Sequence, residues 1–215
     1  PSKLIDGNIT AEIVTNYPFE DGYSVILKAE NPCEIALYLR IPEGAVNAKI
    51  NNSDAKAGYN KITVNLENEV TVNVSFNLEA KLCERDNDMY CVRRGNLTFS
   101  LPVGERWEKK EYVRDGVERK FPYCDYEIYP TTPWNYAFAS DSFEVSFGKV
   151  GKVPFSPEEA PLKIKTKFVP IEWNIVDGIC SEVPSSRVPT GEAVELEMIP
   201  YGCTNLRMTE MPLVK

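Results

Sequence analysis

The sequence DMYCVRRGNLTFSLPV, residues 88–103, lies between two blocks of strand-like sequence and decides how the fold is interpreted. In it, Leu97, Phe99 and Leu101 alternate with polar residues, which is the period-two pattern of a half-buried strand. The Arg-Arg-Gly triplet at 93–95 interrupts the pattern with two charges and a flexible residue, as a bend or bulge would. We therefore predict a two-part all-β chain whose second part begins at this stretch.

Apolar and polar residues alternate repeatedly through residues 1–85. This alternation predicts strands at residues 23–29, 35–41, 46–50, 62–66 and 70–78. Turn-forming residues follow the strands at 42–44 and 51–54. Short strands with frequent turns are typical of a β-sandwich. We place the first sandwich at residues 1–85.

Residues 86–215 keep the strand pattern but have longer connections. Strands are predicted at residues 143–147, 162–168 and 194–198, and irregular loops at 130–136 and 172–192. The densely charged segment 106–120 has Asp-Gly at 115–116, which suits a type I′ hairpin in a solvated ribbon. The predicted fold is all-β, with two consecutive antiparallel β-sandwiches of jelly-roll-like type, at 1–85 and 86–215. We expect helix in less than about a tenth of the residues.

Composition limits the partners. The formal net charge of −8 and the low pI of about 4.8 argue against nucleic acid, which requires a basic face. No run approaches the roughly 18 apolar residues of a membrane span, so no membrane partner is expected. The first ten residues, PSKLIDGNIT, contain no apolar core of a signal peptide, which slightly favours a cytoplasmic location. Pro1 in place of an initiator methionine indicates a trimmed or processed chain.

Cysteine and histidine usage limits the chemistry. The six cysteines, at 33, 83, 91, 124, 180 and 203, form no CxxC motif, and the chain has no histidine. We expect mostly free, buried thiols, with neither zinc nor another cofactor. Without histidine, Ser-His-Asp and Cys-His arrangements are excluded, and carboxylates and thiols are left as possible catalytic groups. Asp125 and Glu127 point the same way on one strand, but a solvated strand face accounts for them, so no catalytic residue is assigned.

Large aromatic residues are the candidates for carbohydrate contact, because sugar faces pack on flat rings as other apolar surfaces do. The candidates are Trp134, Tyr136 and Trp107, with Trp173 as a further plausible ring. The alternative is that these rings close the end of a sandwich, since large rings are usually mostly buried. Both interpretations stay open.

Five segments occur in an order that resembles a known family. They are Tyr17-Pro18-Phe19, LYLRIP at 37–42, the Arg-Gly and following strand at 94–101, PWNY at 133–136 and PYGCTNLR at 200–207. Together they resemble the C-terminal β region of the beta-L-arabinofuranosidase family of glycoside hydrolases, family 127, from about Ile13 to Pro212. The chain departs from that pattern at Glu43-Gly44, where the family has Gly-Trp, and at Asn96, where it has proline.

The resemblance implies a parent enzyme with an N-terminal (α/α)6 barrel, which carries a zinc-bound cysteine nucleophile, followed by two β-sandwiches. None of the barrel motifs is present here, so the resemblance gives no catalytic residue and no metal ligand. It implies a noncatalytic accessory region that packs on and stabilises the barrel, and that is not an enzyme on its own. An autonomous carbohydrate-binding module that uses the loop aromatics is the alternative, and a structural or adhesive β protein is a weaker one.

Overall fold

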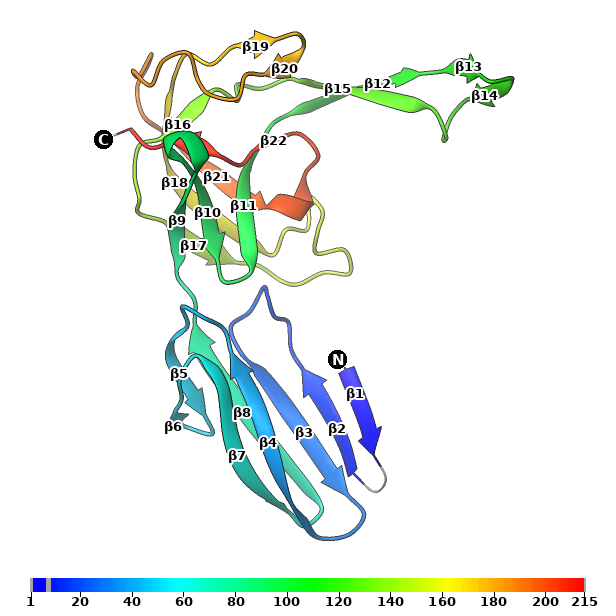
Figure 1. Cartoon of the computed structure of the whole chain (residues 1–215), viewed down its shortest axis with the longest axis vertical. Helices are drawn as coiled ribbons and strands as arrows, with labels where there is room; N and C mark the ends of the chain where they lie inside the picture. The colour runs from blue at the N-terminus through cyan, green and yellow to red at the C-terminus, as the bar shows by residue number, and fades with distance from the viewer. Residues whose placement is uncertain (1, 7–8, 215) are drawn as a thin grey trace. The chain divides into compact units, whose positions relative to one another are not determined.

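The computed structural model describes residues 2–6 and 9–214, with side chains from residue 9 onward. Regular structure consists of strands, apart from two single 3-10 turns at Asp86–Asp88 and Tyr201–Cys203 (Figure 1). The predicted all-β fold of consecutive antiparallel β-sandwiches is thereby confirmed. Within the described residues, no helix has the length and apolar character needed to cross a membrane.

The chain forms two compact units. Unit 1 comprises Pro1–Ala80, Arg93–Leu97 and Phe147–Lys152, and unit 2 comprises Lys81–Val92, Thr98–Ser146 and Val153–Lys215. The sequence places the boundary between the two sandwiches at residues 85 and 86, and that boundary stays a prediction.

Unit 1 is a sandwich of two antiparallel sheets of very different width. One sheet has six strands in the order β1-β2-β3-β8-β5-β6, and the other contains β4 and β7 alone. The bounds of the wide sheet are β1 Ser2–Asp6, β2 Ile9–Val14, β3 Tyr23–Ala29, β8 Glu69–Asn77, β5 Val46–Ile50 and β6 Ser53–Asp54. The narrow sheet consists of β4, Cys33–Ile41, and β7, Gly58–Leu66, paired along their whole lengths.

The core of unit 1 comes from the inward faces of both sheets. Leu27 and Val72 of the wide sheet and Ile41 and Leu66 of the narrow sheet are almost fully buried in one cluster. Strand β8 shows the predicted alternation, with every second side chain from Val72 to Phe76 buried. Because strands lie about 4.8 Å apart, a two-stranded sheet covers only part of a six-stranded one. The inner face of β2 is therefore incompletely covered, and Ile13 on it is 40% exposed.

The predicted bend at residues 93–95 is a tight turn. Strand β10, Met89–Arg94, ends there and β11, Leu97–Pro102, begins after Gly95 and Asn96. Gly95 has a φ of 55°, and a Cβ at this position would lie 2.7 Å from Cδ1 of Leu78. Glycine is thus required both by the left-handed backbone and by the close approach of Leu78.

Unit 2 is built around one nine-stranded antiparallel sheet. Its main path is β16-β18-β21-β11-β10-β23, with β17 added to β18, β22 to β11 and β9 to β10. The bounds not yet given are β9 Ala80–Arg85, β16 Tyr136–Phe138, β17 Glu144–Phe147, β18 Leu162–Pro170, β21 Val194–Pro200, β22 Arg207–Met208 and β23 Met211–Pro212. A parallel bridge between Phe138 and Leu213 joins the two ends of this path, so the sheet curls back on itself. Its enclosed core contains Phe99, Phe138 and Phe168, each fully buried.

Three short ribbons complete unit 2. One pairs β19, Ile175–Val176, with β20, Ile179–Cys180. The charged segment and the residues that follow it form the other two ribbons. These pair β12 (Glu105–Lys110) with β15 (Asp125–Pro130), and β13 (Tyr112–Arg114) with β14 (Val117–Arg119). Asp115 and Gly116 have φ angles of 53° and 75°, which confirms the predicted type I′ character of the turn. Figure 1 shows this two-stranded extension running outward, with β13 and β14 at its far end.

Candidate functional site

Two of the predicted carbohydrate-contact residues, Trp134 and Tyr136, lie close together at the start of β16. Both side chains are half-buried. The ring of Trp134 lies 6.1 Å from that of Trp173, and Tyr136 meets Phe168 edge-to-face at 6.2 Å. Trp173 itself is buried, and its indole N–H donates to the carbonyl of Ser181 at 2.8 Å. These rings therefore form part of the packing of unit 2, and Trp134 and Tyr136 are partly exposed.

The loop that carries Trp134 is held rigidly. The side-chain amide of Asn135 donates to the carbonyl of Ile171 at 2.7 Å. The backbone N–H of Ile171 in turn donates to the carbonyl of Asn135 at 3.0 Å. This reciprocal pair fixes the PWNY segment against the end of β18.

The third candidate, Trp107, lies on a different part of unit 2, in β12 of the ribbon. Its side chain is 48% exposed, and its ring meets Tyr126 edge-to-face at 5.7 Å. The indole N–H donates to Oε2 of Glu105 at 2.8 Å. Trp107 thus contacts Tyr126 of the facing strand rather than the Trp134–Trp173 pair.

Glu105 ties the base of the ribbon to the PYGCTNLR segment, a role that the sequence does not signal. Its Oε1 accepts hydrogen bonds from the backbone N–H of Leu206 at 2.7 Å and of Asn205 at 3.1 Å, and from the hydroxyl of Thr204 at 3.3 Å. Burial raises the pKa of the Glu105 carboxyl. The hydrogen bonds from Leu206, Trp107 and Asn205 together outweigh burial, so that the pKa lies below its ordinary value.

We predict that Glu105→Gln lowers the free energy of unfolding at pH 7 by about 1 kcal/mol, because the charge-assisted hydrogen bonds from backbone N–H groups are weakened. A depressed folded-state pKa stabilises the fold above the unfolded value of about 4.3, and this stabilisation is lost as pH falls through the folded value. The difference between wild type and variant should therefore shrink below about pH 4. Urea titrations from pH 7 to pH 3 measure it. Glu192→Gln, at an exposed loop carboxylate, is the control, and a Glu105 difference that does not change with pH would contradict the assignment.

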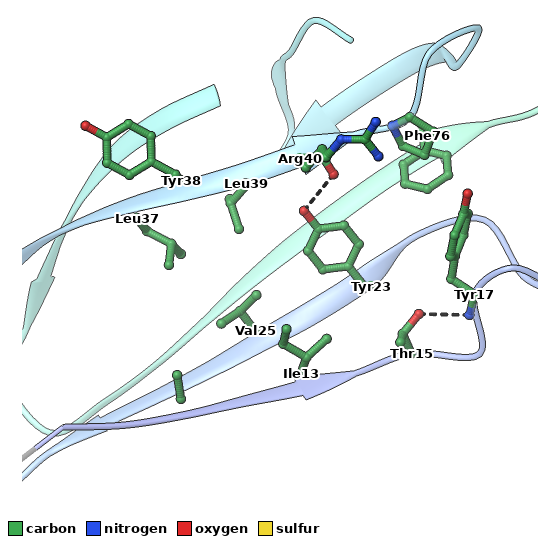
Figure 2. Close-up of a pocket in the computed structure, with 12 residues that line it drawn as sticks. Ile13, Thr15, Tyr17, Tyr23, Val25, Leu37, Tyr38, Leu39, Arg40 and Phe76 are labelled. Carbon is green, nitrogen blue, oxygen red and sulfur yellow. Dashed lines mark hydrogen bonds between the residues drawn. The ribbon is translucent and has the colours of Figure 1, made fainter. Parts of the chain in front are cut away.

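An apolar hollow lies in unit 1, on the part of the wide sheet that the narrow sheet leaves uncovered. It has a volume of about 520 Å³ (Figure 2). The lining residues come from β2, β3, β4 and β8 and the adjoining loops: Ala11, Ile13, Thr15, Tyr17, Tyr23, Val25, Leu37, Tyr38, Leu39, Arg40, Pro42 and Phe76. Figure 2 shows Ile13, Val25 and Leu39 directed into the same space. We call this hollow the apolar groove.

Polar groups are few in the apolar groove. The hydroxyl of Tyr23 donates to the carbonyl of Arg40 at 3.0 Å, whereas the buried hydroxyl of Tyr17 has no hydrogen-bond partner among the described residues. Burial raises the pKa of Tyr17. The twelve lining residues include neither a carboxylate nor a thiol. Because glycoside hydrolysis uses two carboxylates, the apolar groove offers a binding surface rather than catalytic groups.

Sequence reasoning missed the apolar groove, although two of the segments that carry the family resemblance meet in it. Tyr17 belongs to the first of these segments, and LYLRIP at 37–42 supplies four consecutive lining residues and Pro42. The motifs were visible, but no local pattern indicates that β4 has β7 as its one neighbour.

The acidic residues Asp125 and Glu127 lie on a solvated surface of the ribbon. Asp125 and Glu127 are both exposed; Asp125 accepts from the hydroxyl of Tyr112 at 2.8 Å, and Glu127 pairs with Lys110 at 2.9 Å. This confirms their interpretation as a solvated strand face. Across residues 9–214, no three potential metal-ligating side chains come together. The six cysteines, all in the described part of the chain, form no disulfide.

Comparison with known proteins gives similarity in structure only. The chain matches no family model, and no curated protein matches it in sequence. A GH127 beta-L-arabinofuranosidase from Geobacillus Stearothermophilus T6 superposes on 99% of the chain with a TM-score of 0.61 at 17% identity. A second structure, described as a glycoside hydrolase, covers 96% with a TM-score of 0.52 at 16% identity. The chain spans 32% of the length of each. The resemblance inferred from the sequence is thus confirmed as a shared fold.

Proposed function

We propose that this chain is the noncatalytic accessory β region of a glycoside hydrolase of the beta-L-arabinofuranosidase type. It packs on and stabilises an (α/α)6 catalytic barrel that lies outside the chain. The observation that carries the proposal is the superposition of 99% of this chain on about a third of a GH127 beta-L-arabinofuranosidase. The order of the five sequence segments supports the same parentage independently of the superposition.

The chemistry of the described residues is consistent with an accessory role. The apolar groove has no acid–base pair, and Asp125 and Glu127 are engaged with solvent-exposed partners. Glu105, whose pKa is lowered, accepts bonds from backbone N–H groups that hold unit 2 together. An apolar groove at an incompletely covered sheet is a surface that a neighbouring domain can bury with a gain of about 25 cal/mol per Å².

The accessory role predicts that the 215-residue chain shows no turnover of aryl arabinofuranosides, whereas the full parent enzyme hydrolyses them. Added to the separately produced remainder of the parent, the chain should raise the Tm of that remainder by several degrees, because binding to the folded state stabilises it. Chromogenic assays and thermal scans measure both. Turnover by the purified chain that disappears in Glu127→Gln would contradict the proposal.

A carbohydrate-binding module is the second candidate, favoured by the 48% exposure of Trp107 and the partial exposure of Trp134 and Tyr136. In the same experiment, arabinose-containing glycans titrated into the isolated chain distinguish the two functions. Saturable binding that Trp107→Ala or Trp134→Ala abolishes would replace the accessory role by the binding module.

A further inference from the structure

The β12–β15 ribbon of unit 2 has two chemically different faces. Directly paired residues of antiparallel strands point to the same side, and the pairs here are Trp107 with Ile128 and Lys109 with Tyr126 on one side. Phe121 joins this side, since the Lys109 ammonium lies 4.4 Å from the centre of its ring. We call these five residues the aromatic face.

The opposite side of the ribbon, the charged face, consists of Arg106, Glu108, Lys110, Glu127 and Tyr129. Lys110 lies 2.9 Å from Glu127 and 3.3 Å from Glu108, and Arg106 pairs with Glu108. The hydroxyl of Tyr129 donates to Glu127 at 2.5 Å, and Arg106 stacks over the Tyr129 ring at 4.7 Å. These side chains form ion pairs and hydrogen bonds with one another while they remain exposed to water, as charged groups on a solvated surface do.

The aromatic face has no comparable cover. Trp107 and Phe121 are 48% and 62% exposed, and no third strand joins β12 or β15 among the described residues. An isolated two-stranded ribbon is at best marginally stable in water, and a cluster of exposed rings on one side is typical of an interaction site. The ribbon therefore has the composition of an arm whose aromatic face is buried by a partner.

We propose that the aromatic face docks on the part of the parent enzyme that lies outside this chain, an inference that rests on the proposed function. The matched chains extend over about three times the length aligned here, so a partner surface of that size exists in such an enzyme. Residues 105–130, which form the ribbon, carry six basic and seven acidic side chains. The arm is thus close to neutral, and the surface that its aromatic face fits is mainly apolar.

A second copy of the chain fits the aromatic face less well. In a two-fold contact the same patch meets itself, which would bring the two Lys109 ammonium groups of the aromatic faces together. Like charges that face each other across an interface oppose association. The partner is for this reason a different surface rather than another ribbon.

Limited trypsin digestion of the full parent protein, compared with the 215-residue chain, tests the docking. The six Lys and Arg residues of segment 106–120 are the reporters. Cleavage there should be at least about tenfold slower in the full protein, since protection follows burial and closure of the arm. Trp107→Ser combined with Ile128→Ser in the full protein should restore fast cleavage. Glu108→Gln combined with Tyr129→Ser, on the charged face, is the matched control, which keeps all six reporters and should retain protection.

Each result bears on the docking separately from the accessory role. Equal cleavage in the full protein and the isolated chain overturns the docking, yet leaves the accessory role standing if the full protein hydrolyses aryl arabinofuranosides. Protection that rises with the concentration of the isolated chain also overturns it, because a second copy is then the occupant. Circular dichroism of the aromatic-face variant should retain wild-type strand content. If the control loses protection as well, the effect belongs to ribbon folding and the docking is rejected.

Discussion

Replacing Asp21 by alanine is expected to lower the free energy of unfolding by about 3–5 kcal/mol, because it leaves a buried arginine without its counter-charge. The Arg94 side chain is 2% exposed and binds Asp21 through two parallel hydrogen bonds of 3.0 and 2.5 Å. Oδ2 of Asp21 also accepts from the backbone N–H of Leu78 at 2.9 Å. The other contact of the guanidinium is the ring of Phe147, 5.0 Å away. Urea unfolding at neutral pH measures the loss.

Two comparisons separate the buried pair from an ordinary surface charge. The double variant Asp21→Ala with Arg94→Met should recover at least about half of the loss, since it removes the unpaired charge as well. Lys28→Ala breaks the ion pair with Glu69, in which the two side chains are 58% and 52% exposed, and should lower stability far less than Asp21→Ala does. If Asp21→Ala and Lys28→Ala cost the same, the pair at Arg94 does not carry the expected stabilisation.

Period-two alternation predicted the strand faces well because burial on a pleated strand depends on local sequence. The inward residues of β8 follow from it, whereas the turn at Asp115 and Gly116 was predicted from the Asp-Gly pair itself. Alternation does not identify the neighbour of a strand. Tyr23 lies opposite Val74 in the wide sheet, and the pairing of β4 with β7 alone creates the apolar groove. Such pairings join distant segments, so a single sequence contains no local signal for them.

The long-range ion pair of Arg94 and the hydrogen bonds of Glu105 could not be predicted from the sequence, for a related reason. Arg93 and Arg94 look alike in sequence, yet Arg93 is exposed and Arg94 is buried, because adjacent strand residues point to opposite sides. The partner of Arg94 lies 73 residues away, and that of Glu105 about 100 residues away. Similarly, the loop position of Trp134 made it a candidate in the sequence. Its contact with Trp173, however, depends on the hydrogen bond between Asn135 of that loop and the carbonyl of Ile171, which the sequence does not indicate.

Phe168→Ala should destabilise unit 2 by about 3–5 kcal/mol, the cost typical of emptying an aromatic site in a closed core. Phe168 is fully buried in β18, its ring is 5.2 Å from Phe138, and it supports Tyr136 edge-to-face. Phe138 of β16 and Phe168 of β18 lie directly opposite each other in the sheet. The cavity that Phe168→Ala leaves would therefore lie where the sheet curls back on itself. Hydrogen exchange of the β16 and β18 amides, together with urea unfolding, measures the effect.

Tyr123→Ala removes a ring that is 81% exposed and should change stability by less than about 0.5 kcal/mol. Equal effects of the two substitutions would mean that the Phe168 site collapses without a cavity, and that the sheet closure and the position of Tyr136 do not depend on this ring.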